Sequence, residues 1–126
     1  MNAGTALAEA LRSFAAVEHE IVAHDRLGED GDPADLVRLR RELVMQFAAI
    51  APALEADAAL RADPARLAQA TRLLSAFRSQ NAINQADWPA IRVRDDRASY
   101  RASAQRVADR SRAFWQWIGD ELGVAP

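Results

Sequence analysis

Apolar residues recur at alternating spacings of three and four along most of this 126-residue chain. This spacing places them on one face of an α-helix, which has 3.6 residues per turn. Nowhere do β-branched residues alternate with polar ones, as half-buried strands require. The chain is also rich in Ala, Leu and Arg, which favour helices, and it has only five Gly and five Pro. The sequence therefore predicts an all-α protein.

Capping residues and prolines divide this pattern into segments. Asp followed by Pro is a typical helix start, with Asp as the N-cap and Pro in the first turn. The predicted starts and stops are, in chain order, Thr5, Gly28, Asp32-Pro33, Asp63-Pro64, Asp95-Asp96 and Gly123. Pro52 falls inside the second helix, where we expect a kink or a short break. These signals predict a single domain, residues 1–126, folded as an elongated antiparallel bundle of three to four long helices.

The stretch SQNAINQADWPAIR, residues 79–92, places polar residues in the apolar pattern. The three-four spacing of the third helix continues through Leu74, Phe77, Asn81, Asn84, Trp88 and Ile91. The two asparagines therefore fall on the buried face, and we expect the helix to reach at least residue 86. At Pro89 we expect a kink or a new start capped by Asp87. A buried amide is costly unless hydrogen-bonded, so the pair either serves a partner or borders a wet gap near Pro89.

The last predicted helix is rich in aromatic residues. Its core-facing residues are Tyr100, Ala104, Val107, Ser111, Phe114, Ile118 and Leu122. Trp115 and Trp117 lie beside this line. They either widen the contact with the core or form an exposed aromatic patch, which usually marks a protein interface. We favour the interface.

Charge is distributed unevenly between the two halves of the chain. All 16 basic residues are Arg; residues 1–63 have a net charge of −6 and residues 64–126 a net charge of +4. Antiparallel halves of opposite charge attract each other. The arginines that gather in the second half are Arg92, Arg94, Arg97, Arg101, Arg106, Arg110 and Arg112. Such a face raises the hypothesis of nucleic-acid binding, although the net charge of −2 and the absence of a known reader motif argue against it.

Several other functions are disfavoured by the residues present. The chain has no Cys and therefore no thiolate nucleophile or disulfide. His19 and His24 are about 140° apart around a helix, so they cannot bind one metal ion together. No nucleophile elbow or phosphate-binding loop is present, and we expect neither an enzyme nor a cofactor. No run reaches 18 apolar residues and no signal peptide is recognisable, so we expect a cytoplasmic protein without a membrane span.

Three stretches together resemble the FlgN-like flagellar type III export chaperones. They are RRELVMQFAAI at 40–50, LLSAFRSQNAIN at 73–84 with its Asn-x-x-Asn spacing, and the downstream Tyr100. Trp88-Pro89 interrupts a helix that is typically continuous in that family, and the C-terminal part is more regularly patterned than the family's partner-binding tail.

The resemblance implies a cytoplasmic chaperone that holds amphipathic C-terminal helices of hook-associated subunits, at the hook-filament junction, before export. A helix-in-groove mode suits such a client, with residues 97–122 as the docking helix. The partner-binding residues expected on this hypothesis are Asn81, Asn84, Trp88, Tyr100, Val107, Phe114, Trp115, Trp117 and Ile118. Two alternatives stay open: a small regulatory protein that binds nucleic acid or a protein partner through the Arg-rich C-terminal face, and a helical homodimer.

Overall fold

The structure is a computed structural model, and it describes residues 2–126. Over that range the chain forms six α-helices, one 3₁₀ turn and no strand, which confirms the predicted all-α class. The long helices are α1 (Thr5–Leu27), α2 (Pro33–Ala56), α4 (Pro64–Asp87) and α6 (Arg97–Leu122). The short elements are η1 (Gly28–Asp30), α3 (Ala58–Arg61) and α5 (Ala90–Val93).

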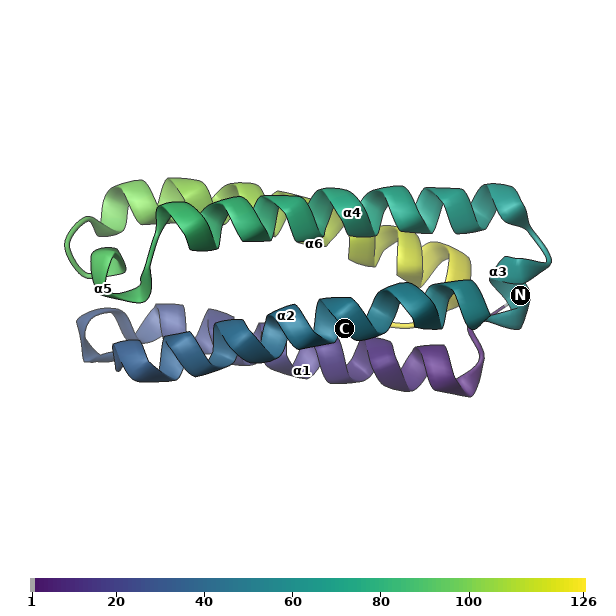
Figure 1. Cartoon of the computed structure of the whole chain (residues 1–126), viewed down its shortest axis with the longest axis horizontal. Coiled ribbons are helices and arrows are strands. Elements are labelled where there is room, and N and C mark those ends of the chain that lie inside the picture. Colours follow the sequence, from purple (N-terminus) through teal and green to yellow (C-terminus); the bar gives the residue numbers. More distant parts are fainter. Residues whose placement is uncertain (1) are drawn as a thin grey trace.

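The four long helices lie lengthwise beside one another and reverse direction at each connection (Figure 1). Helix α1 packs closely along α2, and α4 packs closely along α6. The two pairs meet chiefly through α2 and α4. Among the described residues, α1 and α6 make no comparably close backbone approach. The seam between α1 and α6 is therefore the loosely packed side of the fold.

Phenylalanine side chains form the centre of the core, one from each long helix. They are Phe14, Phe47, Phe77 and Phe114, and each is at most 1% exposed. The rings of Phe14, Phe47 and Phe77 meet edge to face, with centroids 4.7 to 5.5 Å apart. Edge-to-face pairs at this separation add to the free energy gained by burying the rings. All four residues lie on the faces that the three-four spacing predicts to be buried.

Aspartate side chains cap three of the long helices, as the sequence predicts. Asp32, Asp63 and Asp96 each accept a hydrogen bond from a backbone N–H in the first turn of the helix that follows. The first helix differs from the prediction, because its N-cap is Gly4 and Thr5 is already helical. No side chain caps this end; instead the Gly4 N–H donates to a carboxylate from a distant part of the chain, that of Asp57.

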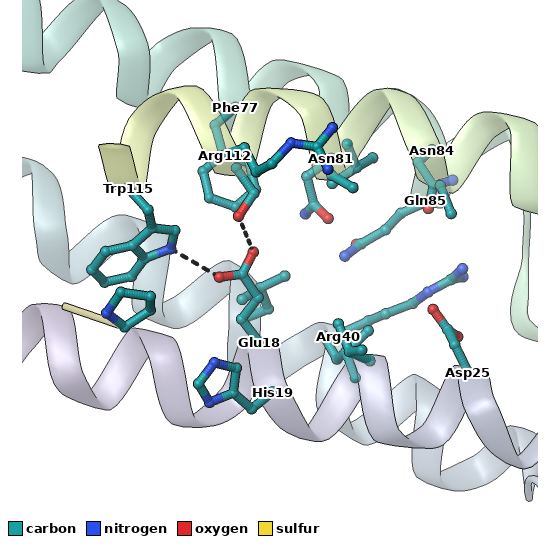
Figure 2. Close-up of a pocket in the computed structure, with 18 of the residues that line it drawn as sticks. Glu18, His19, Asp25, Arg40, Phe77, Asn81, Asn84, Gln85, Arg112 and Trp115 are labelled. Carbon is teal, nitrogen blue, oxygen red and sulfur yellow. Dashed lines mark hydrogen bonds between the residues drawn. The ribbon is translucent and has the colours of Figure 1, made fainter. Parts of the chain in front are cut away.

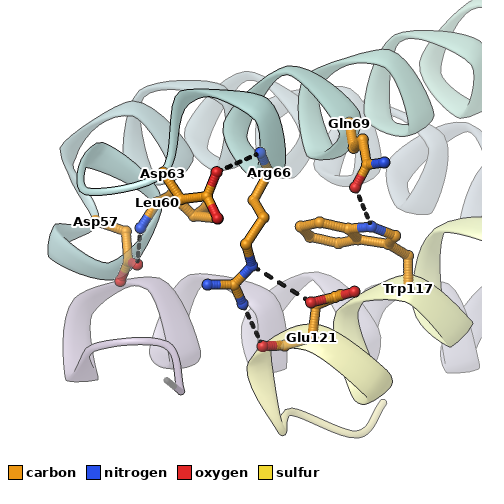
Figure 3. A network of polar contacts seen from close by, with 7 residues as sticks. All are labelled: Asp57, Leu60, Asp63, Arg66, Gln69, Trp117 and Glu121. Carbon is orange, nitrogen blue, oxygen red and sulfur yellow. Dashed lines mark hydrogen bonds and ion pairs between the residues drawn. The ribbon is translucent and has the colours of Figure 1, made fainter.

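Asp57 joins the start of α1 to the corner between α2 and α3. One carboxylate oxygen accepts from the Gly4 N–H at 2.8 Å, and the other accepts from the Leu60 N–H at 3.2 Å, which caps α3 (Figure 3). The residue is only 6% exposed. The sequence does not reveal this role, because an aspartate between two helices has no local pattern that distinguishes a cap from a tertiary anchor.

The two prolines have different effects on their helices. Helix α2 continues through Pro52 to Ala56, so of the kink or short break expected there, the break is absent. Helix α4 extends to Asp87, which confirms a helix past residue 86. Pro89 neither kinks α4 nor follows an Asp87 cap, because Trp88 leaves the helical conformation and Pro89 itself is the N-cap of α5. The helical phase is lost there, and Ile91, predicted to be buried, is 73% exposed.

Among residues 2–126, no ion pair joins the acidic first half to the basic second half. The pairs found within residues 2–126 are Arg38–Glu42, Arg66–Glu121 and Arg112–Asp109, and each lies within one half. Acidic residues of α1 instead accept hydrogen bonds from uncharged side chains of α6. Among these residues the two halves are therefore joined by neutral donors that meet carboxylates, and by the Arg40 guanidinium, which donates to the Trp88 carbonyl, but not by an arginine–carboxylate pair.

We expect Asp57→Ala to lower the free energy of unfolding by about 1–3 kcal/mol, because it removes a helix cap and leaves two backbone donors without their acceptor. Chemical denaturation measures this change. Asp57→Asn keeps one acceptor oxygen and serves as the matched control, with a smaller loss. An Asp57→Ala variant as stable as the parent would show that water replaces the carboxylate at no cost.

Candidate functional site

A cavity of about 360 Å³ lies along the seam between α1 and α6. Helices α1 and α6 form its two sides, while side chains of α2 and α4 lie behind it (Figure 2). Pro126 also borders it. Pockets that hold small ligands or partner side chains have volumes of roughly 300 to 1,000 Å³, so this cavity is at the lower end of that range.

Apolar side chains from all four long helices line much of the cavity. They include Ile21 and Val22 from α1, Leu43 from α2, Phe77 from α4 and Val107 from α6. Val22 is 43% exposed, and Ile21 and Val107 are only half-buried. Ile21 and Val107 lie on faces that the sequence predicts to be buried. They stay accessible because α1 and α6 do not close on each other.

Two hydrogen-bonded ties link α6 to α1 at the cavity. In the first, the Tyr100 hydroxyl donates to the Asp25 carboxylate, 3.1 Å from each oxygen. In the second, Trp115 Nε1–H donates to Glu18 Oε1 at 2.9 Å and Ser111 Oγ–H donates to Glu18 Oε2 (Figure 2). The two carboxylates lie seven residues apart on α1, which is about 10 Å along a helix. The ties therefore hold two points of the seam without closing it.

Two side chains of the cavity carry hydrogen-bond donors without a partner among the described residues. Arg40 Nη2 and Gln85 Nε2 are buried and have no hydrogen-bond partner within the described part of the chain. Arg40 Nη1 does have one, since it donates to the Trp88 carbonyl. Figure 2 shows the Arg40 guanidinium beside the Asp25 carboxylate, whereas the Gln85 amide extends the other way, toward Asn81. A buried donor without an acceptor costs about 1–3 kcal/mol, so such groups call for an explanation and a bound partner supplies one.

Burial governs the ionisation of Asp25 and Tyr100, which form one of the two hydrogen-bonded links between α1 and α6. It raises the pKa of the Asp25 carboxyl above its ordinary value, against the opposing effects of the Tyr100 hydrogen bond and of the charges on His24, Arg40 and Arg97. Burial and the negative charge of Asp25 raise the pKa of Tyr100 to about 12. Tyr100 is therefore a hydrogen-bond donor over the whole neutral pH range.

Five of the predicted partner-binding residues border the cavity, and they are Asn81, Asn84, Tyr100, Val107 and Trp115. Both asparagines are buried on the face that the helical spacing predicts. Their amides differ in environment, because Asn84 Nδ2 donates to Ser103 Oγ at 2.8 Å. The Asn81 amide points toward the cavity in Figure 2.

The other four predicted residues lie elsewhere. Phe114 and Ile118 are fully buried in the core. Trp88 is also buried, with its ring 6.0 Å from that of Tyr100. Trp117 is half-buried beside α4, and its Nε1–H donates to Gln69 Oε1 at 3.2 Å (Figure 3). Arg66 and Glu121 lie near it, with Arg66 Nε 3.3 Å from Glu121 Oε2 but without hydrogen-bond geometry.

The predicted exposed aromatic patch on the last helix is wrong. Trp115 is only 8% exposed, and its ring centroid lies 6.3 Å from that of Phe14 and 5.6 Å from that of Phe114. The indole instead widens the contact of α6 with the core, which is the alternative that the sequence left open. Glu18 makes this burial favourable, because it accepts the hydrogen bond that a buried indole N–H requires.

The arginine face is partly occupied by contacts within the chain. The Arg92 guanidinium lies over the Trp88 ring, 4.3 Å from its centroid, and Arg112 pairs with Asp109. Arg97 is half-buried. The arginines of this cluster that stay exposed and outside the ion pairs of residues 2–126 are Arg94, Arg101, Arg106 and Arg110.

Charged residues of the cavity were missed by the reading of the sequence, although they carry a signal. Glu18 and Asp25 continue the spacing of Phe14 and Ile21 on α1. Arg40 lies in the same register as Leu36 and Leu43 on α2. A charged residue at a position where the helical spacing calls for an apolar one marks a candidate site as well as an asparagine does, because both place a polar group on a face that packs.

Comparison with protein-family models, curated proteins and solved structures found no match to this chain. Among the described residues, no three His, Cys, Asp or Glu side chains gather in a way that could hold a metal ion. None of the helices over residues 2–126 combines the length and the apolar character needed to cross a membrane.

We expect Asp25→Asn to be at least as stable as the parent at pH 7, with an advantage that shrinks as the pH falls toward 4. The raised pKa means that the folded state binds this proton more tightly than the unfolded state, so the charged carboxylate costs stability at neutral pH. Protonation at low pH removes that cost, whereas Asn is neutral throughout and still accepts from Tyr100. Thermal melts of both proteins over this pH range measure the difference.

Asp95→Asn is the control, because Asp95 is exposed and far from the cavity lining. We expect no comparable pH-dependent gain for it. If Asp25→Asn were less stable at pH 7 and recovered at low pH, the buried carboxylate would be a net stabilising group and its described environment would be contradicted.

Proposed function

We propose that this chain is an export-chaperone-like protein of the cytoplasm that binds an amphipathic helix of a partner in the cavity between α1 and α6. The observation that carries the proposal is the open, largely apolar seam at which two long helices are tied by hydrogen bonds and do not pack closely. In a closed bundle Ile21 and Val107 would be covered. Here they border a cavity that another apolar surface can fill.

The size of the cavity favours side chains over a whole helix as its contents. A cavity of roughly 150 Å³ holds one benzene ring, so about 360 Å³ has room for two or three large apolar side chains. A helix is about 10 Å across. The partner helix would therefore lie along the seam and insert the residues of one face, spaced three, four or seven positions apart.

The resemblance to FlgN-like chaperones supports the kind of partner. The stretch that carries it, residues 73–84, includes both asparagines of the cavity wall. The proposed clients are hook-associated subunits, whose amphipathic C-terminal helices self-associate if they are left uncovered. The proposal takes the whole chain as one domain, an elongated antiparallel bundle of four long helices, and it involves no catalysis.

The docking mode differs in one respect from that expected from the sequence. Helix α6 is packed along α4 and supplies one wall of the cavity, so it does not dock onto a client as a free helix. Its contribution is the line of half-buried residues Ala104, Val107, Ala108 and Ser111.

Nucleic-acid binding is the second candidate, and the observation in its favour is the set of exposed arginines outside ion pairs, such as Arg101, Arg106 and Arg110. Phosphate contacts weaken steeply with added salt, whereas apolar docking changes little. A high-salt wash therefore separates the two candidates.

A matched pair of substitutions on α6 tests the proposal. Ala108 is half-buried and lines the cavity, whereas Ala113 on the same helix is exposed and lies outside it. We expect tagged parent and Ala113→Glu protein to recover hook-associated subunits from the cells of origin under a high-salt wash. Ala108→Glu should recover at least roughly ten-fold less, because it places an unpaired charge in an apolar contact.

Mass spectrometry identifies the bound proteins, and circular dichroism shows whether each variant keeps its helices. Equal recovery by the two variants would contradict binding in the cavity. Nucleic acid recovered only at low salt would favour the arginine face, and a second copy of the chain as the sole partner would favour the homodimer.

A further inference from the structure

We infer that the partner helix carries a carboxamide side chain, Asn or Gln, on its apolar face, and that Gln85 Nε2–H donates to its carbonyl oxygen. This inference rests on the proposed function and adds the chemistry that selects the partner. It follows from three features of the cavity: the unpaired donors, the charges that surround them, and the polar groups that could accept hydrogen bonds from the partner's amide.

The unpaired donors require an acceptor from outside the described chain. Arg40 Nη2 on α2 and Gln85 Nε2 on α4 are both buried, and both residues line the cavity. Gln85 Nε2 has no hydrogen-bond partner within residues 2–126, and Arg40 Nη2 has none of strict geometry, although the Arg40 side chain interacts with the Tyr100 hydroxyl. Purely apolar contents would keep both donors unsatisfied and would exclude water from them as well, so an occupant with an oxygen at this point binds better.

The charges around these donors favour a neutral acceptor. The positive charges of His24, Arg40 and Arg97 already act on the carboxylate of Asp25, which forms one tie of the seam. Glu18, two turns away on α1, adds another negative charge to the lining, and Arg112 opposite is paired with Asp109. A partner Asp or Glu would place a further negative charge beside Asp25, and like charges at close range disfavour each other. A carboxamide satisfies the donors without that repulsion.

A carboxamide also uses the polar atoms that remain. Its NH₂ group requires acceptors, and the Asn81 amide on the cavity wall points into the same space. The Asp25 oxygens offer further acceptor positions. An alcohol or an ester presents an oxygen but not this combination of one acceptor and two donors. Phe77, Leu43 and Val107 nearby then contact apolar residues three, four or seven positions along the partner helix.

Small side-chain mimics test this chemistry without a client. We would titrate 3-phenylpropanamide, 3-phenylpropanoate and propylbenzene into the full ¹⁵N-labelled chain and follow the side-chain NH₂ signals of Gln85 and Asn81 by NMR. We expect the amide to bind roughly ten-fold more tightly than either of the other two, because only it satisfies the donors without added charge. The Gln85 signal should move with the amide and much less with the hydrocarbon.

Two glutamines of α4 give matched variants. Gln85→Met removes the cavity donor at similar size, and Gln80→Met changes a residue that lies outside the cavity lining. Gln85→Met should abolish the preference for the amide and leave propylbenzene binding unchanged, whereas Gln80→Met should alter neither. Circular dichroism checks that both variants fold.

The inference is overturned if the carboxylate binds as tightly as the amide, if Gln85→Met keeps the preference, or if no amide binding is seen. The export-chaperone function is decided separately, by recovery of secreted subunits. If the chain recovers a client but does not prefer the amide, the proposed function stands and the carboxamide inference is contradicted. If the chain prefers the amide but recovers no client, the recognition chemistry is supported and the proposed function is contradicted.

Discussion

Two carboxylates on one face of α1 determine how the last helix is held. Glu18 and Asp25 accept hydrogen bonds from Trp115, Ser111 and Tyr100, and along the cavity these bonds take the place of close backbone packing between α1 and α6. A helix pair joined by side chains that reach across a gap stays farther apart than a pair whose ridges interdigitate. The cavity, its accessible apolar wall and its unpaired donors all follow from that separation.

Contacts outside the cavity hold α1 and α6 in position. The edge-to-face phenylalanines join α1, α2 and α4 at the centre, and Phe114 of α6 packs against Phe77 with ring centroids 6.0 Å apart. Asp57 fastens the start of α1 to the α2–α3 corner. Helix α6 is held along α4, with Trp117 bonded to Gln69 near its end. Because both walls are anchored away from the cavity, filling it requires no rearrangement of the core. That preorganisation lowers the cost of binding a partner.

The candidate site could be predicted from the sequence only in part. The helical spacing placed Asn81 and Asn84 on a packed face, and the structure has both on the cavity wall. It did not separate their roles, since the bond from Asn84 to Ser103 joins helices whose register depends on the intervening turn. The same limit applied to Trp115. Its position around α6 is local information, but the acceptor that lets it be buried, Glu18, lies 97 residues away.

The sequence by itself determined where the helices are and which faces they bury. Those properties depend on residues within one or two turns, such as the Asp-Pro starts, the terminal glycines and the three-four spacing. Only the tertiary structure decided that α1 and α6 stay apart, that Pro52 leaves α2 unbroken and that Arg40 and Gln85 share one cavity. These are relations between helices, and they follow from the packing of whole elements, which no local pattern records.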